Sequence, residues 1–156
     1  MDRPIPAALA LDKLGIRYRL FEHPQPPDSL EEAAHQRGQA PGQVVRSILF
    51  RLSQEQFVIV LMSGPGQVSW KRIRAALGVS RISMASEAEV LSVTGFVRGA
   101  VTPLGLPRTL RILADESVFI HEEISIGSGI RGVAVLLKST DLQIALDHVE
   151  TGKFAL

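Results

Sequence analysis

The sequence predicts an α/β (α+β) fold: a single domain over residues 1–156, with a mixed, largely antiparallel sheet surrounded by helices. A chain of 156 residues has about the length of one domain, and no linker or repeat divides it. Helix and strand patterns are interspersed without a regular βαβ alternation. The strand patterns at 44–52 and 57–62 are separated by only a few residues, which favours antiparallel pairing because parallel neighbours need a long crossover.

Helix signals occur at five places along the chain. Ser29 and Ser86 each precede a glutamate three residues later, which is the pattern of a capping box. Gly38 and Gly95 end the same two helices, since glycine readily adopts the left-handed conformation of a C-terminal cap. Thr140 is expected to cap the last helix. The expected helices lie at 7–14, 29–38, 69–77, 86–95 and 140–146.

Short runs of β-branched and apolar residues lie between the helices and are bounded by turn residues, which is typical of strands. With 46% apolar residues, a chain of this size can bury enough surface to form one core. The expected strands lie at 17–21, 44–52, 57–62, 109–113, 124–126 and 132–137.

The net charge of +1 conceals an uneven distribution of charged residues. Residues 1–36 carry 4 basic and 6 acidic side chains and residues 112–156 carry 3 and 7, whereas residues 37–111 carry 10 and 3. Because Lys and Arg gain affinity for a polyanion by releasing its counterions, this basic middle segment is compatible with a groove for a phosphate-bearing partner. The alternative is that its charges are spread over a solvated surface.

The composition excludes several kinds of chemistry. The absence of cysteine rules out disulfides, thiolate nucleophiles, zinc fingers and iron–sulfur clusters. His23, His35, His121 and His148 are too scattered for a metal-ligand spacing, so we expect no metal and no other cofactor. The N-terminus lacks a signal-peptide pattern, and no run approaches the roughly 18 apolar residues of a membrane span. We therefore expect a soluble, cytoplasmic protein without a membrane partner.

The segment Gly127–Gly132 has the spacing G-x-G-x-x-G, which also occurs in dinucleotide-binding sites. Such a site needs a helix after the glycines, with the pyrophosphate at its N-terminus, but residues 133–137 here are strand-like. We therefore reject the dinucleotide interpretation and expect a glycine-rich turn between two strands. Its backbone N–H groups could hold an anion or a polar ligand, and a plain hairpin turn is the alternative.

A second glycine-containing loop, residues 99–107, reads Gly-Ala-Val-Thr-Pro-Leu-Gly-Leu-Pro. Its two glycines allow close approach of the backbone, and its two prolines stiffen it. Such a loop could present fixed N–H donors to a carbonyl or an oxyanion. A rigid turn between a helix and a strand would use the same residues.

In this loop and in four other fragments, the chain resembles the YbaK/ProX family of aminoacyl-tRNA deacylases. The fold of that family also occurs as the editing insertion domain of bacterial prolyl-tRNA synthetases. The resemblance extends over about residues 8–146. The fragments that carry it, in chain order, are Phe21-Glu22-His23, residues 29–34 (SLEEAA), residues 42–50 (GQVVRSILF), Gly95 with residues 99–107, and residues 124–129 (ISIGSG).

The resemblance implies the compact fold of the prolyl-tRNA synthetase-associated editing domain, with a curved mixed sheet and a pocket for the aminoacylated 3′ end of tRNA. It also implies hydrolysis of the ester that joins a wrong amino acid to the terminal ribose. We expect a small amino acid such as Cys or Ala on proline tRNA. Family members use neither a metal nor a protein nucleophile. The implied partners are the aminoacyl-tRNA acceptor end and prolyl-tRNA synthetase, and no DNA.

The resemblance also assigns candidate site residues. Arg46, Gly99 and Thr102 are the expected catalytic residues. Gly99 belongs to the backbone-donor loop of the family, and Arg46 stands where many members carry a functional lysine. Arginine keeps the charge of lysine, but it presents a planar fork and cannot act as a base. The residues expected to bind substrate are His23, Pro103, Gly105, Gly127, Ser128 and Gly129.

Three interpretations of the function remain open at this point. The first is a free-standing, trans-editing deacylase. The second is a non-catalytic module of the same fold that binds aminoacyl-tRNA or aminoacyl-adenosine and has lost turnover through the Lys-to-Arg change. The third is a small-nucleotide binder that uses the turn at residues 127–132.

Overall fold

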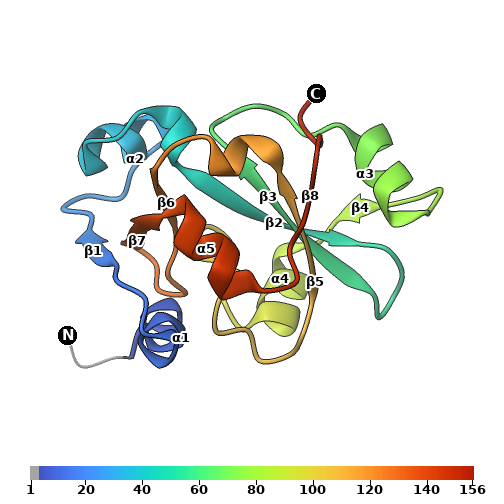
Figure 1. Cartoon of the computed structure of the whole chain (residues 1–156). Coiled ribbons are helices and arrows are strands. Elements are labelled where there is room, and N and C mark those ends of the chain that lie inside the picture. Colours follow the sequence, from blue (N-terminus) through green and yellow to red (C-terminus); the bar gives the residue numbers. More distant parts are fainter. Residues whose placement is uncertain (1–3) are drawn as a thin grey trace.

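In residues 4–156, which the computed structural model describes, the strands form two neighbouring sheets with five α-helices around them (Figure 1). A bridge between Val44 and Ser125 connects the two sheets. Four of the strand pairs are antiparallel and two are parallel, which confirms the expected mixed, largely antiparallel pairing. The difference from the prediction is that the strands are divided between two sheets.

The larger sheet has the strand order β4-β2-β3-β5-β8. At its centre, β2 (Val45–Arg51) and β3 (Phe57–Ser63) form an antiparallel hairpin. Beyond β2 lies the antiparallel β4 (Ser83–Met84), and beyond β3 lie β5 (Arg111–Asp115) and β8 (Glu150–Gly152), each parallel to its neighbour. The sequence did not predict β4 and β8 because strands of two and three residues are too short to show an alternating pattern.

The smaller sheet consists of β1 (Arg19–Glu22), β7 (Val133–Lys138) and β6 (Glu123–Gly127), in that order, and both of its pairs are antiparallel. The glycine-rich segment connects β6 directly to β7, which confirms the expected turn between two strands. A Cβ at Gly127 would lie 2.1 Å from the carbonyl oxygen of Val101. Only glycine allows the turn and the 99–107 loop to pack this closely.

The five expected helices are all present, and their ends follow the expected caps at most positions. Ser86 and Glu89 form a reciprocal capping box. Ser29 also caps its helix, but the Glu32 carboxylate accepts from the N–H of Asp28 and not from that of Ser29. The helices are α1 (Pro6–Leu14), α2 (Leu30–Arg37), α3 (Trp70–Leu77), α4 (Glu87–Thr94) and α5 (Ser139–Leu146), with 3₁₀ turns η1 (Pro41–Gln43) and η2 (Glu116–Phe119).

The expected cap of the last helix is wrong. α5 begins at Ser139, one residue before Thr140, and the residue at its cap position is Lys138, which makes no side-chain cap hydrogen bond. The Ser139 hydroxyl donates to the carbonyl oxygen of His121, 2.6 Å away. This contact reaches back to the segment before β6, so a local sequence pattern could not reveal it.

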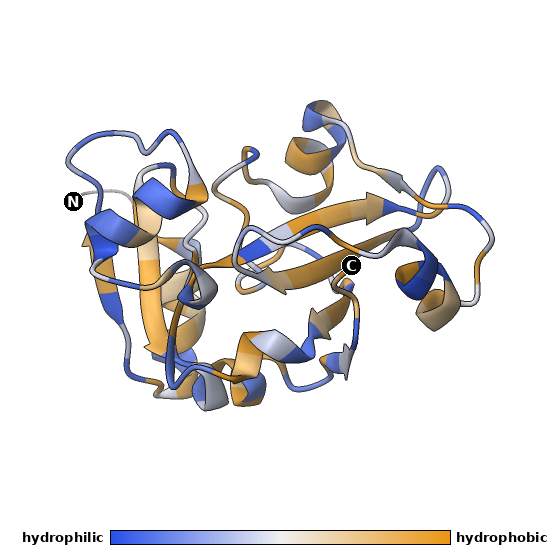
Figure 2. Ribbon diagram, turned by 90° about the horizontal axis from the view of Figure 1, so that it is seen from above, coloured by the Kyte–Doolittle hydropathy of each residue, from blue (hydrophilic) through white to orange (hydrophobic). Residues whose placement is uncertain are grey.

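The two larger apolar clusters hold most of the elements together, and both receive side chains from the central strands β2 and β3; strands are largely orange in Figure 2. The main cluster lies between the two sheets and receives side chains from α1, α4 and α5. A second cluster, around Phe50 and Ile73, packs α3 on the larger sheet. Each fully buried side chain of this kind contributes about 1.5–3 kcal/mol. Among the helices of residues 4–156, none has the length and apolar character needed to cross a bilayer.

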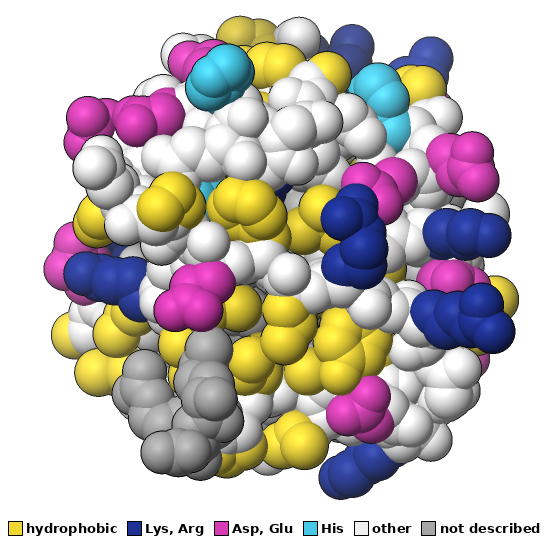
Figure 3. Space-filling model, turned by 90° about the vertical axis from the view of Figure 1, so that its left-hand side faces the viewer, with side chains coloured by type: hydrophobic (Ala, Val, Ile, Leu, Met, Phe, Trp, Pro, Cys, Tyr) yellow, Lys and Arg dark blue, Asp and Glu magenta, His cyan; other side chains and the backbone are white. Residues whose placement is uncertain are grey.

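The two ends of the molecule differ in surface character. Apolar side chains gather on the face that carries α1 and β1 (Figure 3), where Leu9, Leu14 and Leu20 are exposed. The α3 end instead exposes Lys71 and Arg72. The basic middle of the sequence is therefore partly gathered at one end of the fold.

Candidate functional site

A cavity of about 810 Å³ opens between α2, β2, β4 and the two glycine loops. Its volume is within the usual range of pockets for small molecules and cofactors. Of the nine predicted site residues, four line it. These four are His23, Arg46, Gly99 and Gly127.

The charged side chains around this cavity are mostly cationic. Arg37, Arg46, Arg98 and Arg131 line it, against one carboxylate, that of Asp28. Because most of the remaining wall is apolar, water screens these charges less than it would on an open surface. Such a cavity suits an anionic ligand. Within residues 4–156, no group of three or more His, Asp or Glu side chains is placed to hold a metal ion.

Arg46 is held by backbone carbonyl groups of the loop that leads from β3 to α3. Its Nε donates to the carbonyl oxygen of Gly64 over 2.8 Å, and one of its terminal nitrogens donates to that of Gly66. Burial lowers the pKa of its guanidinium, which nevertheless stays charged at neutral pH. Arg46 therefore fixes the course of this loop at the cavity wall, and its remaining N–H groups are the ones that could contact a ligand.

Arg37, at the end of α2, was not among the predicted site residues. Its Nε donates to Nε2 of His23 over 3.0 Å, and Nη1 donates to Oγ of Ser125 over 2.9 Å. Nδ1 of His23 lies 2.7 Å from Oε1 of Gln36, which can only accept, so Nδ1 carries the proton and Nε2 is free to accept from Arg37. The guanidinium is thus oriented by two neutral groups.

Burial has a clear electrostatic effect on Arg37. It lowers the pKa of the guanidinium to about 10. No carboxylate within residues 4–156 forms an ion pair with this side chain. A half-buried cation that lacks a protein anion lines the cavity, and an anionic ligand would supply the missing charge.

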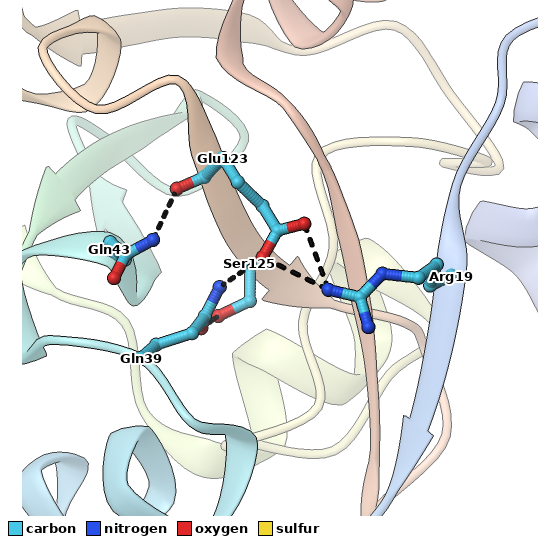
Figure 4. A network of polar contacts seen from close by, with 5 residues as sticks. All are labelled: Arg19, Gln39, Gln43, Glu123 and Ser125. Carbon is cyan, nitrogen blue, oxygen red and sulfur yellow. Dashed lines mark hydrogen bonds and ion pairs between the residues drawn. The ribbon is translucent and has the colours of Figure 1, made fainter.

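The partners of Arg37 belong to a longer chain of polar contacts, part of which Figure 4 shows. The Ser125 hydroxyl donates to Oε1 of Gln39 over 2.7 Å, and Gln43 donates to the backbone carbonyl of Glu123. The Glu123 carboxylate pairs with Arg19 at 2.9 Å and with Nε2 of Gln39 at 3.5 Å. This network ties the segment after α2 to β6 and β1, and it keeps the Glu123 carboxylate away from Arg37.

The 99–107 loop meets the cavity at its first residues. Gly99 has φ +91° and open space on its Cα side. Within residues 4–156, the backbone N–H groups of Gly99 and Val101, which both line the cavity, have no hydrogen-bond acceptor. These two N–H groups are therefore available for the donor role that the sequence pattern predicts for this loop.

The other five predicted residues do not line the cavity. The buried hydroxyl of Thr102 accepts from the N–H of Leu104, and that of Ser128 donates to the carbonyl oxygen of Val133 over 2.7 Å. Gly105 and Gly129 lie against Pro6, where a Cβ would be 2.8 and 2.9 Å from the nearest atom. Pro103 is buried. These residues hold the two loops in place, and direct contact with substrate remains a prediction without support from the lining.

Ser47 is a further lining residue that the sequence gave no reason to select. It lies on β2, next to Arg46. Its Oγ is the buried side-chain polar atom in residues 4–156 that has no hydrogen-bond partner. Buried hydroxyl groups are nearly always paired, so this one is a natural contact for a polar group of a ligand.

Comparison with known proteins agrees with the family resemblance seen in the sequence. The chain is similar to the multifunctional Ser/Thr-tRNA deacylase ProXp-y of Escherichia coli (strain K12), with 29% identity over 140 residues that cover 86% of this chain and 83% of that protein. It is also similar to part of the proline–tRNA ligase of Bacillus licheniformis, with 34% identity over 90 residues that cover 58% of this chain and 16% of the ligase.

The fold is similar to that of a solved structure described as a candidate trans-editing enzyme for prolyl-tRNA synthetase. The TM-score is 0.87 at 24% identity, and the match covers 97% of this chain and 95% of that one. Residues 24–144, which include α2, the cavity-lining strands and both glycine loops, match the family described as the aminoacyl-tRNA editing domain. The expected family is thereby confirmed, and the chain belongs to the aminoacyl-tRNA editing domain family.

Proposed function

We propose that this chain is a free-standing aminoacyl-tRNA deacylase that removes a wrong amino acid from the 3′ end of tRNA. The observation that carries the proposal is the cationic cavity, in which, among residues 4–156, Arg37 forms no ion pair and the N–H of Gly99 has no acceptor. A tRNA 3′ end supplies a phosphodiester that can pair with Arg37 and an ester carbonyl that can accept from the N–H of Gly99. The match with ProXp-y along most of both chains supports action as a separate protein.

The proposed reaction is hydrolysis by water. Water adds to the ester carbonyl carbon, and the negative charge that develops on the carbonyl oxygen is stabilised by the N–H of Gly99. The bond between this carbon and the ribose oxygen then breaks, the ribose oxygen takes a proton, and the amino acid and tRNA leave. Fixed donors of this kind are worth about 2.7–4 kcal/mol each in known enzymes. Arg46 stabilises the same charge as a cation, since it cannot serve as a base.

The amino acid to be removed is proposed to be small. Ala and Cys on proline tRNA follow from the family resemblance, and the name of the Escherichia coli relative adds Ser and Thr. The unpaired Oγ of Ser47 favours a side chain with a hydroxyl or thiol group, because such a group would satisfy it. Ser, Thr and Cys are therefore expected to be released faster than Ala. Prolyl-tRNA synthetase, which produces such mischarged tRNA, is the proposed partner protein.

A panel of mischarged tRNAs tests this function. Ala, Cys, Ser and Thr are each attached to proline tRNA, and release of the amino acid is followed with and without the protein. Correctly charged proline tRNA is the control. Release of no amino acid above the rate in buffer would end the proposal.

The second candidate, a binding module without turnover, is favoured by Arg46 at the position of the family lysine. Arg46→Lys separates the two. A lysine ammonium cannot reach both carbonyl oxygens in the geometry that Arg46 uses, so the deacylase proposal predicts no gain in hydrolysis and a loss of a few fold. A gain of tenfold or more in the rate would instead identify the natural chain as a binding module.

A further inference from the structure

A group of basic side chains lies outside the cavity, on α3 and the segment after it. We call Lys71, Arg72, Arg74 and Arg81 the α3 basic surface. Arg74 is half-buried, and the other three are exposed. No acidic residue occurs in the sequence between Glu55 and Glu87. Within the described part of the chain, no carboxylate forms an ion pair with any of the four, so their charge is uncompensated.

The packing of α3 directs these side chains outwards. Ile73 is fully buried against the larger sheet, and Trp70 packs edge-on against Phe50 with ring centres 5.2 Å apart. Residues three apart on a helix share a face, so Lys71 and Arg74 lie together on a side that does not pack on the sheet. The basic face is therefore a fixed consequence of how α3 is anchored.

Both ends of the α3 segment are connected to the cavity wall. Before α3, the loop at Gly64 and Gly66 is held by Arg46, which lines the cavity. After α3, Met84 of β4 also lines the cavity, and it follows Arg81 by three residues. Three residues span at most about 11 Å, so Arg81 lies within that distance of the cavity rim. Arg81 therefore places positive charge of the α3 basic surface close to the rim of the cationic cavity.

We propose that the α3 basic surface binds the double-helical acceptor stem of the tRNA whose 3′ end occupies the cavity. The inference rests on the proposed function and adds a second contact region to it. A tRNA 3′ end is a short single strand that continues into a duplex. When the single strand enters the cavity, the phosphates of the duplex pass over the rim where this surface lies. Contacts of Lys and Arg with phosphates add affinity without selecting a base sequence.

A triple substitution, Lys71→Gln, Arg74→Gln and Arg81→Gln, tests the surface. Arg72 is left unchanged because its Nη1 donates to the carbonyl oxygen of Ala155, so its loss would disturb the C-terminal segment. The matched control is Lys13→Gln, Arg17→Gln and Lys138→Gln. These three residues are exposed and do not line the cavity, and their substitution removes as much positive charge as the α3 variant does. Lys13 lies in α1 and Arg17 follows it, at the opposite end of the molecule from α3 (Figure 1).

Three substrates with the same amino acid are compared: full-length tRNA, an acceptor-stem minihelix, and the aminoacylated trinucleotide CCA, which has no duplex. The α3 variant is expected to raise KM about tenfold or more for the tRNA and the minihelix, and to leave the trinucleotide unchanged. The slope of log KM against log salt for the minihelix is expected to fall by about 2 to 3, roughly one for each lost phosphate contact. The control variant is expected to match the natural protein.

Other patterns would overturn the proposal. Equal losses on all three substrates would mean damage to the cavity. A loss on tRNA without a loss on the minihelix would place the contact away from the stem. A loss that appears only when a synthetase is added would assign the surface to a protein partner. No loss at all would show that the surface binds no RNA.

A binding measurement separates this inference from the deacylase proposal. Uncharged minihelix, labelled with a fluorophore, is titrated with natural and variant protein, and anisotropy is recorded. If the natural protein hydrolyses none of the three substrates but binds the minihelix more tightly than the α3 variant does, the deacylase proposal fails and the stem contact stands. If both proteins bind the minihelix equally, the stem contact fails whatever the hydrolysis shows.

Discussion

Arg37→Met is the substitution that most directly tests whether the cavity is built to bind an anion. Methionine has a similar length and fills much of the same space without a charge. It removes the hydrogen bonds from Nε to His23 and from Nη1 to Ser125, which measure 3.0 and 2.9 Å. The substitution has two opposing effects on the free energy of unfolding, because it removes a buried charge and also removes two hydrogen bonds.

The first effect is relief from burial of the charge. Burial lowers the Arg37 pKa to about 10, and a change of one pKa unit corresponds to 1.36 kcal/mol, so burial destabilises the charged folded state by on the order of 3 kcal/mol. The second effect is loss of two hydrogen bonds from a charged donor, each worth about 1.5 kcal/mol or somewhat more. The effects nearly cancel. We expect the free energy of unfolding to change by less than about 2 kcal/mol, or about 4–8 °C in Tm.

The expected effect on activity is much larger. A charge-assisted hydrogen bond to a phosphate is worth about 1.5–3 kcal/mol, and 1.4 kcal/mol is a factor of ten. We therefore expect Arg37→Met to lower kcat/KM roughly tenfold to a hundredfold, mainly through KM. The assay is release of labelled amino acid from mischarged tRNA over a range of concentrations, with Tm measured in parallel by thermal unfolding.

The matched control is Arg17→Met, which removes the same group from an exposed position outside the cavity. It should keep both Tm and kcat/KM. An unchanged kcat/KM in Arg37→Met would refute the anion-binding role. So would a loss of activity accompanied by a fall in Tm of well over 8 °C, since the side chain would then act mainly through stability.

Three further predictions concern the two glycine loops and the C-terminal segment. Hydrogen bonds from Ser117 and from the N–H groups of Phe154 and Ala155 lower the pKa of Asp115 overall, although burial alone would raise it. The ionised Asp115 therefore stabilises the fold at pH values above its unfolded pKa of about 3.9, and this stabilisation is lost as the pH falls through its lower folded pKa. Asp115→Asn should accordingly weaken the pH dependence of the urea-unfolding midpoint below about pH 4. Gly127→Ala should destabilise the fold by more than about 3 kcal/mol in urea unfolding, because its Cβ would lie 2.1 Å from an oxygen of Val101. Gly99→Ala meets no atom but strains a backbone with φ +91°, so kcat should fall at least tenfold with little change in KM, and a change in KM alone would contradict the oxyanion role.

The elements of the fold that could be predicted are those with local signals. Ser29 and Ser86 lie before their helices as expected, and Gly38 and Gly95 follow them in the left-handed conformation with φ +69° and +81°. The prediction fails where distant contacts decide. The two-residue strand β4 exists because it pairs with β2, and α5 begins where Ser139 can reach the backbone of His121. Neither contact leaves a mark in the adjoining sequence.

The candidate site divides in a similar way. Gly99 and Gly127 could be selected because glycine-rich loops have few roles, and both line the cavity. Arg37 could not, because its significance depends on its having no ion pair within residues 4–156, and the sequence places Glu31 and Glu32 about one and a half turns away on the same helix. Only the structure shows that the Glu32 carboxylate lies at the start of α2, where it accepts hydrogen bonds from the backbone N–H of Asp28 and from Nε2 of Gln36.

Arg37 and Arg46, the two partly buried arginines of the cavity, show how the fold keeps positive charge available to a ligand. Arg46 donates to backbone carbonyl groups, so it stabilises the loop before α3 whether or not a ligand is present. Arg37 is instead held by a neutral histidine and a neutral serine, and the Glu123 carboxylate in its network is separated from it by Ser125 and Gln39 and pairs with Arg19. A carboxylate in place of Ser125 would hold Arg37 more firmly, but it would cancel the charge and occupy the donors that a phosphate needs. The neutral side chains around Arg37 are therefore as much a part of the proposed site as the cation they orient.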